Sequence, residues 1–196
     1  MLFSLIEKLE HVDVILASAS PRRYELLKNL GLNFKVIPSH AEESHEKRAD
    51  MEEVVKANAR LKGEAVAKKY PEALVISADT IVALNDHIMG KPKNEQDAFE
   101  MLKALSGQTH RVYTGLGLFN DKRFVLDAVC TQVRFRNLSD EEIWAYINTG
   151  EPFDKAGGYG IQGQGALLVE GINGCYYNVV GLPLTRLFTM LKEFFT

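Results

Sequence analysis

Two adjacent arginines, Arg22 and Arg23, stand at the start of a predicted helix. Ser20 can cap that helix, and Pro21 suits its first position. The free N–H groups at a helix start attract anions, and a guanidinium fork matches phosphate oxygens. The segment therefore predicts a phosphate site, to which Ser18 adds a hydroxyl. The alternative is that Ser20 is only a cap and both arginines form a solvated first turn.

A second chemical feature is Asp79, which interrupts the long apolar run from Leu74 to Leu84. Such a run is typical of a buried β-strand. A carboxylate at its centre calls for a functional or structural reason. Two further carboxylates, Glu42 and Glu43, lie in a polar segment that is predicted to be a loop.

Lys62 belongs to a predicted helix that begins at Asp50 and runs toward Tyr70. Apolar residues recur there at helical spacing, and Asp50 is a suitable cap. On this pattern alone, Lys62 is interpreted as a solvated surface lysine.

Residues 154–165 contain five glycines among a few polar side chains. This composition excludes an ordinary strand or helix and indicates backbone that passes close to a ligand. The alternative is a flexible surface loop, which the apolar residues Tyr159 and Ile161 disfavour.

The elements that must position these groups alternate between strands and helices. Strands are predicted at 12–16, 34–37, 74–84, 87–89, 111–119 and 124–135, with a closing hairpin formed by 166–172 and 176–180. Helices are predicted from Pro21 to Leu30, from Asp50 toward Tyr70, after Asn94, after a Ser139…Glu142 capping box, and after Pro183.

Length and charge fit a single globular domain. The chain has 196 residues and a net charge of −3, so one sizeable core is expected over 1–196, with 1–12 as a helical extension. That extension is interrupted by charged residues, which disfavours a signal or membrane segment.

The net charge of the chain offers no basic field that would attract nucleic acid. Cys130 and Cys175 lack the spacing of a zinc site or disulfide framework, so a reducing cytoplasm is the simplest location. The five histidines lack ligand spacing and are interpreted as structural or exposed.

Five motifs, taken in order, resemble the Maf family of nucleoside triphosphate pyrophosphatases over nearly the whole chain. They are Ser18-Ala-Ser-Pro-Arg-Arg23, Ala78-Asp-Thr80, Gly90-Lys-Pro92, Leu105-Ser-Gly107, and Asp154-Lys-Ala-Gly157 with Tyr159-Gly-Ile-Gln-Gly163. The resemblance implies an α/β fold: a twisted mixed sheet flanked by helices, with two lobes around a central cleft, similar to inosine-triphosphate pyrophosphatases. It also implies a cytoplasmic enzyme that hydrolyses a nucleoside triphosphate to the monophosphate and pyrophosphate.

The resemblance also assigns roles to residues. Asp79 would orient or deprotonate the attacking water and, with Glu43 rather than Glu42, hold magnesium or manganese. Such hard cations prefer carboxylates. The substrate would be bound by Ser18, Arg22, Arg23, Lys62, Thr80, Lys91, Lys155 and Gln162.

Base preference is expected from Arg22, Thr80 and Gln162, which match the branch that hydrolyses dTTP and UTP. An amide and a hydroxyl can pair with the carbonyl and N–H edge of uracil or thymine. One alternative is a pyrophosphatase for modified purine nucleotides or 7-methyl-GTP. Another is a non-catalytic nucleotide-binding regulator of cell division, a role that the family's link to septum formation suggests.

Asp79 discriminates between enzyme and regulator, because an unpaired carboxylate beside a polyphosphate would weaken simple binding, whereas a metal-dependent hydrolase requires it. The expected partner is a small nucleotide. No stable nucleic-acid complex and no membrane association are expected, and a homodimer is one option for the oligomeric state.

Overall fold

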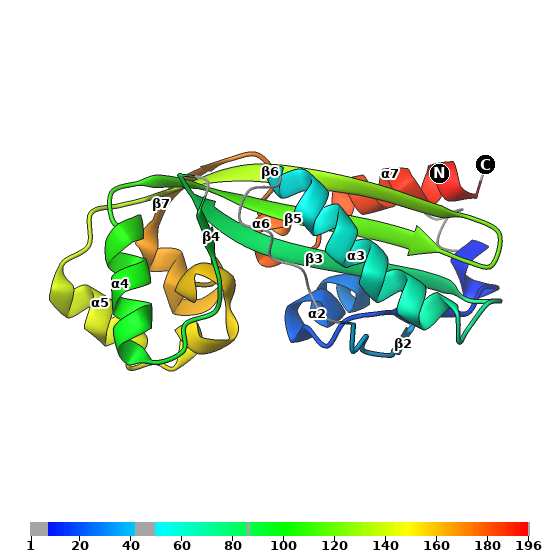
Figure 1. Cartoon of the computed structure of the whole chain (residues 1–196), viewed down its shortest axis with the longest axis horizontal. Coiled ribbons are helices and arrows are strands. Elements are labelled where there is room, and N and C mark those ends of the chain that lie inside the picture. Colours follow the sequence, from blue (N-terminus) through cyan, green and yellow to red (C-terminus); the bar gives the residue numbers. More distant parts are fainter. Residues whose placement is uncertain (1–7, 42–49, 86, 196) are drawn as a thin grey trace. The chain divides into compact units, whose positions relative to one another are not determined.

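The computed structural model describes residues 8–41, 50–85 and 87–195. Within these residues seven strands form one sheet, in the order β2-β1-β3-β5-β6-β7, with β4 paired to β3 (Figure 1). The strands are β1 (Val14–Leu16), β2 (Lys35–Val36), β3 (Leu74–Leu84), β4 (His87–Met89), β5 (Thr109–Phe119), β6 (Phe124–Phe135) and β7 (Val169–Asn173).

The sheet is mixed. β1 runs parallel to both β2 and β3, with Val14 opposite Leu74. β4 is antiparallel to β3, and β7 is antiparallel to β6. The α-helices are α2 (Pro21–Asn29), α3 (Met51–Ala67), α4 (Glu95–Leu105), α5 (Asp140–Ile147), α6 (Tyr176–Val180) and α7 (Leu184–Phe194). A mixed sheet flanked by helices confirms the predicted α/β class.

The chain forms two compact units. The first comprises Met1–Asp79, Thr114–Val129 and Gly181–Thr196, and the second comprises Thr80–Tyr113 and Cys130–Val180.

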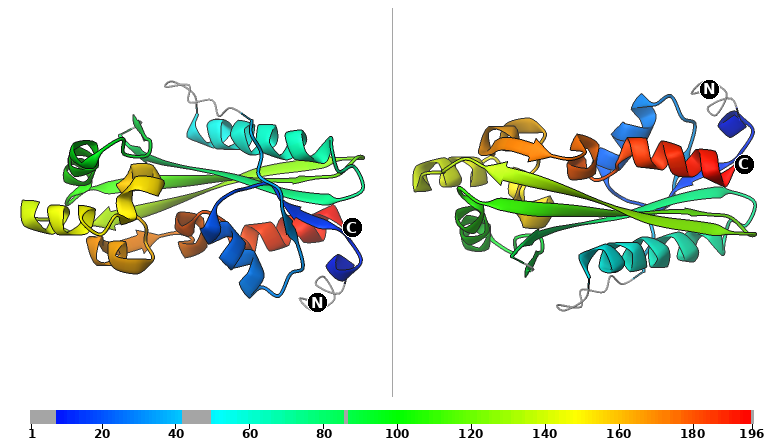
Figure 2. Two further views of the ribbon diagram at one scale, coloured as in Figure 1. Left: turned by 90° about the horizontal axis from the view of Figure 1, so that it is seen from below. Right: turned by 90° about the horizontal axis from the view of Figure 1, so that it is seen from above.

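In the first unit, α3 covers one face of the strands, and α2 and α7 cover the other (Figure 2). A core cluster there consists of Ile15, Ala17, Val66, Ala73, Val75 and Phe119. Helix α3 lies very close to β5 because Gly115 has no side chain. A Cβ atom at Gly115 would stand 2.2 Å from the carbonyl oxygen of Val55. The contact between Gly115 and the backbone of Val55 therefore holds α3 and its side chains at a short distance from the sheet.

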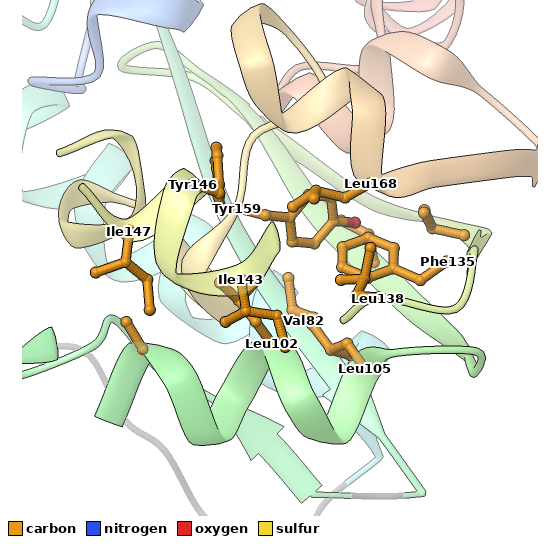
Figure 3. Packing of buried hydrophobic residues seen from close by; sticks show 13 residues of the cluster. Val82, Leu102, Leu105, Phe135, Leu138, Ile143, Tyr146, Ile147, Tyr159 and Leu168 are labelled. Atoms are coloured by element: carbon orange, nitrogen blue, oxygen red, sulfur yellow. The ribbon is translucent and has the colours of Figure 1, made fainter. Parts of the chain in front are cut away.

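The core of the second unit lies between α4, α5 and the strands (Figure 3). Ile143 and Ile147 of α5 point toward α4, where Leu102 and Leu105 are fully buried. Tyr146 lies on the opposite side of α5 (Figure 3). The rings of Phe135 and Tyr159 meet edge to face, with 4.7 Å between their centroids.

Most of the predicted elements are confirmed. β3 has the predicted bounds, β4 pairs back onto it, and Asn94 caps α4 by accepting a hydrogen bond from the N–H of Asp97. Both hydrogen bonds of the Ser139…Glu142 capping box are present. Residues 8–10 of the expected N-terminal helix are helical, residues 11 and 12 form a turn and a bend instead, and residues 1–7 lie outside the described residues.

Two local predictions are wrong. Ser20 occupies the N-cap position of α2, but its side chain makes no capping bond; instead its N–H donates to the hydroxyl of Ser18. The predicted closing hairpin is also wrong, because its second arm, residues 176–180, is helix α6. There the Asn178 amide donates to the carbonyl of Val112 and the hydroxyl of Thr131, and these tertiary bonds outweigh local strand preference.

Candidate active site

Asp79 lies at the centre of β3 and is only 4% exposed. Both of its carboxylate oxygens accept hydrogen bonds from α3. The Lys62 ammonium donates to Oδ1 at 2.7 Å, and the Asn58 amide donates to Oδ2 at 3.0 Å. Because Asn58 and Lys62 are separated by one helical turn, they lie on the same side of α3. The charge of this buried carboxylate is therefore matched by Lys62, and its orientation is fixed. The expectation of an unpaired carboxylate at this position is wrong.

The position of Lys62 contradicts the surface interpretation. Its side chain is 13% exposed and forms an ion pair with Asp79. Sequence reasoning missed Asn58 altogether. The available signal was a polar residue on the otherwise apolar, buried side of α3, four residues before Lys62.

Arg23 is 8% exposed, so the interpretation of a solvated first turn is wrong for this residue. Its Nη1 donates to the hydroxyl of Ser18 at 3.0 Å and to the carbonyl of Ala78 at 2.9 Å. Its Nε donates to the carbonyl of Gly181 at 2.8 Å. The guanidinium thus connects the turn after β1, the strand residue that precedes Asp79, and the segment before α7.

Arg22, the other predicted ligand on α2, is intermediate in exposure. Thr80 follows Asp79 on β3 and is also intermediate in exposure. Neither role in base recognition is tested by these positions, and both remain predictions.

The second unit brings two other predicted phosphate ligands onto neighbouring segments. The N–H of Gly157 donates to the carbonyl of Gly90 at 2.9 Å. This bond joins the exposed loop that carries Lys91 to the glycine-rich segment that carries Lys155. The Lys155 ammonium itself is held by the carboxylate of Asp154 at 2.5 Å and the carbonyl of Glu151 at 2.6 Å.

The glycine-rich segment is built from short 3₁₀ turns, η1 (Glu151–Asp154), η2 (Ala156–Gly158) and η3 (Gly163–Leu168). Within it Tyr159 is buried, and its hydroxyl lies 2.7 Å from Nε2 of His110. Burial lowers the pKa of His110 to about 4 and raises the pKa of Tyr159. Both groups are therefore neutral at pH 7 and anchor the segment, while Gln162 is exposed.

The predicted metal ligand Glu43, like its alternative Glu42, lies outside the described residues. Within 8–41, 50–85 and 87–195, no three His, Cys, Asp or Glu side chains cluster in a way that could hold a metal ion. Asp79 nevertheless fits a magnesium site. Each of its oxygens has a second lone pair beyond the hydrogen bonds from Asn58 and Lys62, and magnesium usually binds one or two carboxylates together with substrate phosphates.

In the described part of the chain, none of the helices combines the length and apolar character needed to cross a bilayer.

Comparison with known proteins identifies close relatives. The sequence model of a family described as "Maf-like protein" matches residues 13–194. A "dTTP/UTP pyrophosphatase" of Clostridium perfringens is 50% identical over 187 residues, which cover 93% of this chain and 97% of the relative. One of Dictyoglomus thermophilum is 50% identical over 185 residues, with 92% and 95% covered. The solved structure of the Staphylococcus aureus Ham1 protein matches with a TM-score of 0.45 and 17% identity, over 63% of this chain and 71% of that chain.

Proposed function

This chain belongs to the Maf-like protein family, and on that premise we propose that it hydrolyses nucleoside triphosphates, above all dTTP and UTP, to the monophosphate and pyrophosphate. The relatives that share half of its residues carry the name of that activity. The observation that supports a catalytic role is the buried carboxylate of Asp79, held on both oxygens by α3.

In the proposed reaction, Asp79 accepts a hydrogen bond from a water molecule and orients it toward the α-phosphorus. It then takes the proton as the new P–O bond forms and pyrophosphate leaves. A general base must be held in the correct orientation, which Asn58 and Lys62 provide. A magnesium or manganese ion, bound by Asp79 and Glu43, would supply neutralisation of the triphosphate charge.

Phosphate binding is assigned to Ser18, Arg23, Lys62, Lys91 and Lys155. Charge-assisted hydrogen bonds from lysine and arginine to phosphate oxygens are stronger than hydrogen bonds between neutral groups. The bond between the Arg23 guanidinium and the carbonyl of Ala78 supports this assignment, because it places a fixed cation beside the strand that carries Asp79.

Base recognition is assigned to Arg22, Thr80 and Gln162. A side-chain amide carries both donors and an acceptor, so it can pair with the carbonyl and N–H edge of uracil or thymine. Cytosine replaces one carbonyl with an amino group and leaves such a pair unsatisfied. We therefore place CTP below dTTP and UTP as a substrate, and purine triphosphates lower still.

The setting that we propose is the cytoplasm, with free nucleotides as partners, no stable nucleic-acid complex and no membrane association. A net charge of −3 provides no general attraction to a nucleic acid. A homodimer is our proposal for the oligomeric state, to be tested by the molar mass in solution.

The decisive experiment is a panel of nucleoside triphosphates, including 7-methyl-GTP and ITP, incubated with magnesium or manganese while monophosphate and pyrophosphate are quantified. We expect the highest kcat/KM for dTTP and UTP. Release of phosphate in place of pyrophosphate would contradict the reaction. Higher kcat/KM for a purine triphosphate would contradict only the pyrimidine preference. A chain that binds nucleotides without turnover would instead be a regulator.

A further inference from the structure

Glu151 is the first residue of η1, and its carboxylate holds the start of η3. Its Oε1 accepts a hydrogen bond from the backbone N–H of Gln164 at 3.0 Å, and its Oε2 accepts one from Gly165 at 3.3 Å. A carboxylate that accepts two backbone N–H groups at a helix start makes charge-assisted bonds, which are stronger than neutral ones. Glu151 therefore fixes one end of the segment 160–165.

Tyr146 of α5 fixes the other end. Its hydroxyl accepts a hydrogen bond from the N–H of Gly160 at 3.2 Å, and the residue is only 5% exposed. Burial raises the pKa of Tyr146, so the phenol remains protonated. Tyr146 and Glu151 thus hold the two ends of the segment 160–165 through separate hydrogen bonds.

The two ends of the segment also meet directly. A Cβ atom at Gly165 would stand 2.1 Å from the carbonyl oxygen of Gly160 and 2.8 Å from the hydroxyl of Tyr146. Only glycine permits this approach. Between the two ends, Ile161 is 9% exposed and Gln162 is exposed. The closed segment therefore buries one side chain and presents the next one outward.

We infer that Glu151 and Tyr146 are positioning residues for Gln162 and thereby set the selectivity between pyrimidine bases. This inference rests on the proposed function, in which Gln162 reads the base. A base-reading amide discriminates only when its donor and acceptor are fixed, because a mobile amide can turn to satisfy the wrong base. Neither Glu151 nor Tyr146 needs to touch the nucleotide for this effect.

Glu151 contributes to the two parts of the site through different atoms, its carboxylate on the side of base selectivity and its backbone carbonyl on the side of phosphate binding. The carbonyl of Glu151 accepts a hydrogen bond from the Lys155 ammonium. A side-chain substitution at Glu151 leaves that carbonyl in place. Selectivity between bases can therefore be altered by mutation while the phosphate contact of Lys155 is retained, which makes the two contributions separable by experiment.

The test uses the full chain with Glu151→Gln and Tyr146→Phe. Each variant keeps the shape of its side chain and weakens the hydrogen bonding at one end of the segment 160–165. Glu100→Gln is the matched control, since Glu100 is exposed on α4 of the same unit and accepts a hydrogen bond from Gln96. Hydrogen exchange reports on these bonds directly, without nucleotide: at the amides of Gln164 and Gly165 for Glu151→Gln, and at the amide of Gly160 for Tyr146→Phe.

We expect exchange to accelerate about tenfold at Gln164 and Gly165 in Glu151→Gln and at Gly160 in Tyr146→Phe, the usual scale for one lost hydrogen bond. The ratio of kcat/KM for UTP over CTP should fall by a similar factor of about ten in both variants. The inhibition constant of pyrophosphate should change by less than about twofold, because no phosphate ligand is altered. Glu100→Gln should match the unmodified chain in all three measurements.

Unchanged exchange in both variants, or faster exchange with an unchanged UTP-to-CTP ratio, would overturn the inference. Equal losses for UTP, CTP and pyrophosphate would also overturn it, because they would indicate a general structural role. If the unmodified chain hydrolyses no pyrimidine triphosphate, the proposed function itself fails and the inference fails with it. If the unmodified chain is active and the variants keep its selectivity, the inference is overturned while the proposed function stands.

Discussion

The ammonium of Lys62 lies 2.7 Å from Oδ1 of Asp79, and both side chains are largely withdrawn from water. A buried ion pair contributes little net stability, because both charges lose their hydration. Its retention on a strand that is otherwise apolar is therefore better explained by a functional need for the carboxylate. Substitutions of Asp79, Lys62 and Asn58 can therefore separate the structural from the catalytic contribution of this carboxylate.

Asp79→Asn should preserve the fold and lower kcat by at least about a hundredfold, the usual scale for loss of a general base. The amide keeps the size of the side chain and retains one acceptor for Lys62. Turnover of dTTP at saturating metal, with circular dichroism as the control for folding, provides the measurement. Near-normal turnover would show that Asp79 is not the base.

Lys62→Met should lower the free energy of unfolding by about 3 kcal/mol, because it leaves the buried carboxylate of Asp79 without its counter-charge. Adding Asp79→Asn to this variant should restore most of that loss, since the uncompensated charge is removed. Urea unfolding of the single and double variants measures both effects. Equal stability of Lys62→Met and the unmodified chain would contradict the buried pairing.

Asn58→Leu replaces the amide with an apolar side chain of similar volume and removes the hydrogen bond to Oδ2 of Asp79. We expect kcat to fall by about tenfold while KM for dTTP is maintained, because the contact orients the base and does not bind substrate. Steady-state kinetics at saturating metal measure this. A rise in KM at constant kcat would instead assign Asn58 to substrate binding.

Lys91→Ala and Lys155→Ala should weaken all nucleotide substrates by a similar factor, since each lost charge-assisted contact costs roughly 1.5–3 kcal/mol. Arg23→Ala should do the same and should also destabilise the fold, because the guanidinium holds the carbonyls of Ala78 and Gly181. The kcat/KM values of each variant for nucleotides with different bases test the phosphate role. Thermal unfolding tests whether Arg23→Ala alone also lowers stability. An altered preference between bases would rule out a phosphate role for that residue.

His110 should make stability dependent on pH. Its pKa is lowered to about 4 by burial, below the ordinary value of 6.5. Between these values the unfolded chain binds a proton that the folded chain does not, so stability falls as pH decreases from 6.5 to 4. The expected loss is about 3 kcal/mol. In His110→Phe this contribution should be absent. Urea unfolding across the pH range can measure the effect. If the stability of the variant and that of the unmodified chain depended on pH in the same way, the prediction would be contradicted.

Local patterns allowed much of the fold to be predicted. β3, its hairpin to β4 and the capping box of α5 depend on neighbouring residues, so their signals lie within short stretches of sequence. Helix α6 could not be predicted in this way. Its β-branched and aromatic residues favour a strand, whereas the bonds that favour the helix join Asn178 to distant residues on β5 and β6.

The same distinction applies to the candidate site. Asp79 is visible in the sequence because it breaks an apolar strand, whereas the partners of its carboxylate depend on how α3 packs against the sheet. That packing requires Gly115 to admit the backbone of Val55, a contact between residues far apart in the chain. Helical periodicity therefore placed Lys62 on the surface, and Asn58 gave no sign of a role.

The one-turn interval between Asn58 and Lys62 has a consequence for redesign of this protein. Residues may be exchanged along the solvent side of α3, but an insertion or deletion between these two positions would rotate one donor away from Asp79 by about 100° per residue. Lengthening the helix beyond Lys62 leaves the pair intact. A sequence alignment that opens a gap between these two positions would therefore align residues that cannot both contact the carboxylate. A transplanted α3 should keep residues 58–62 together and unchanged in length.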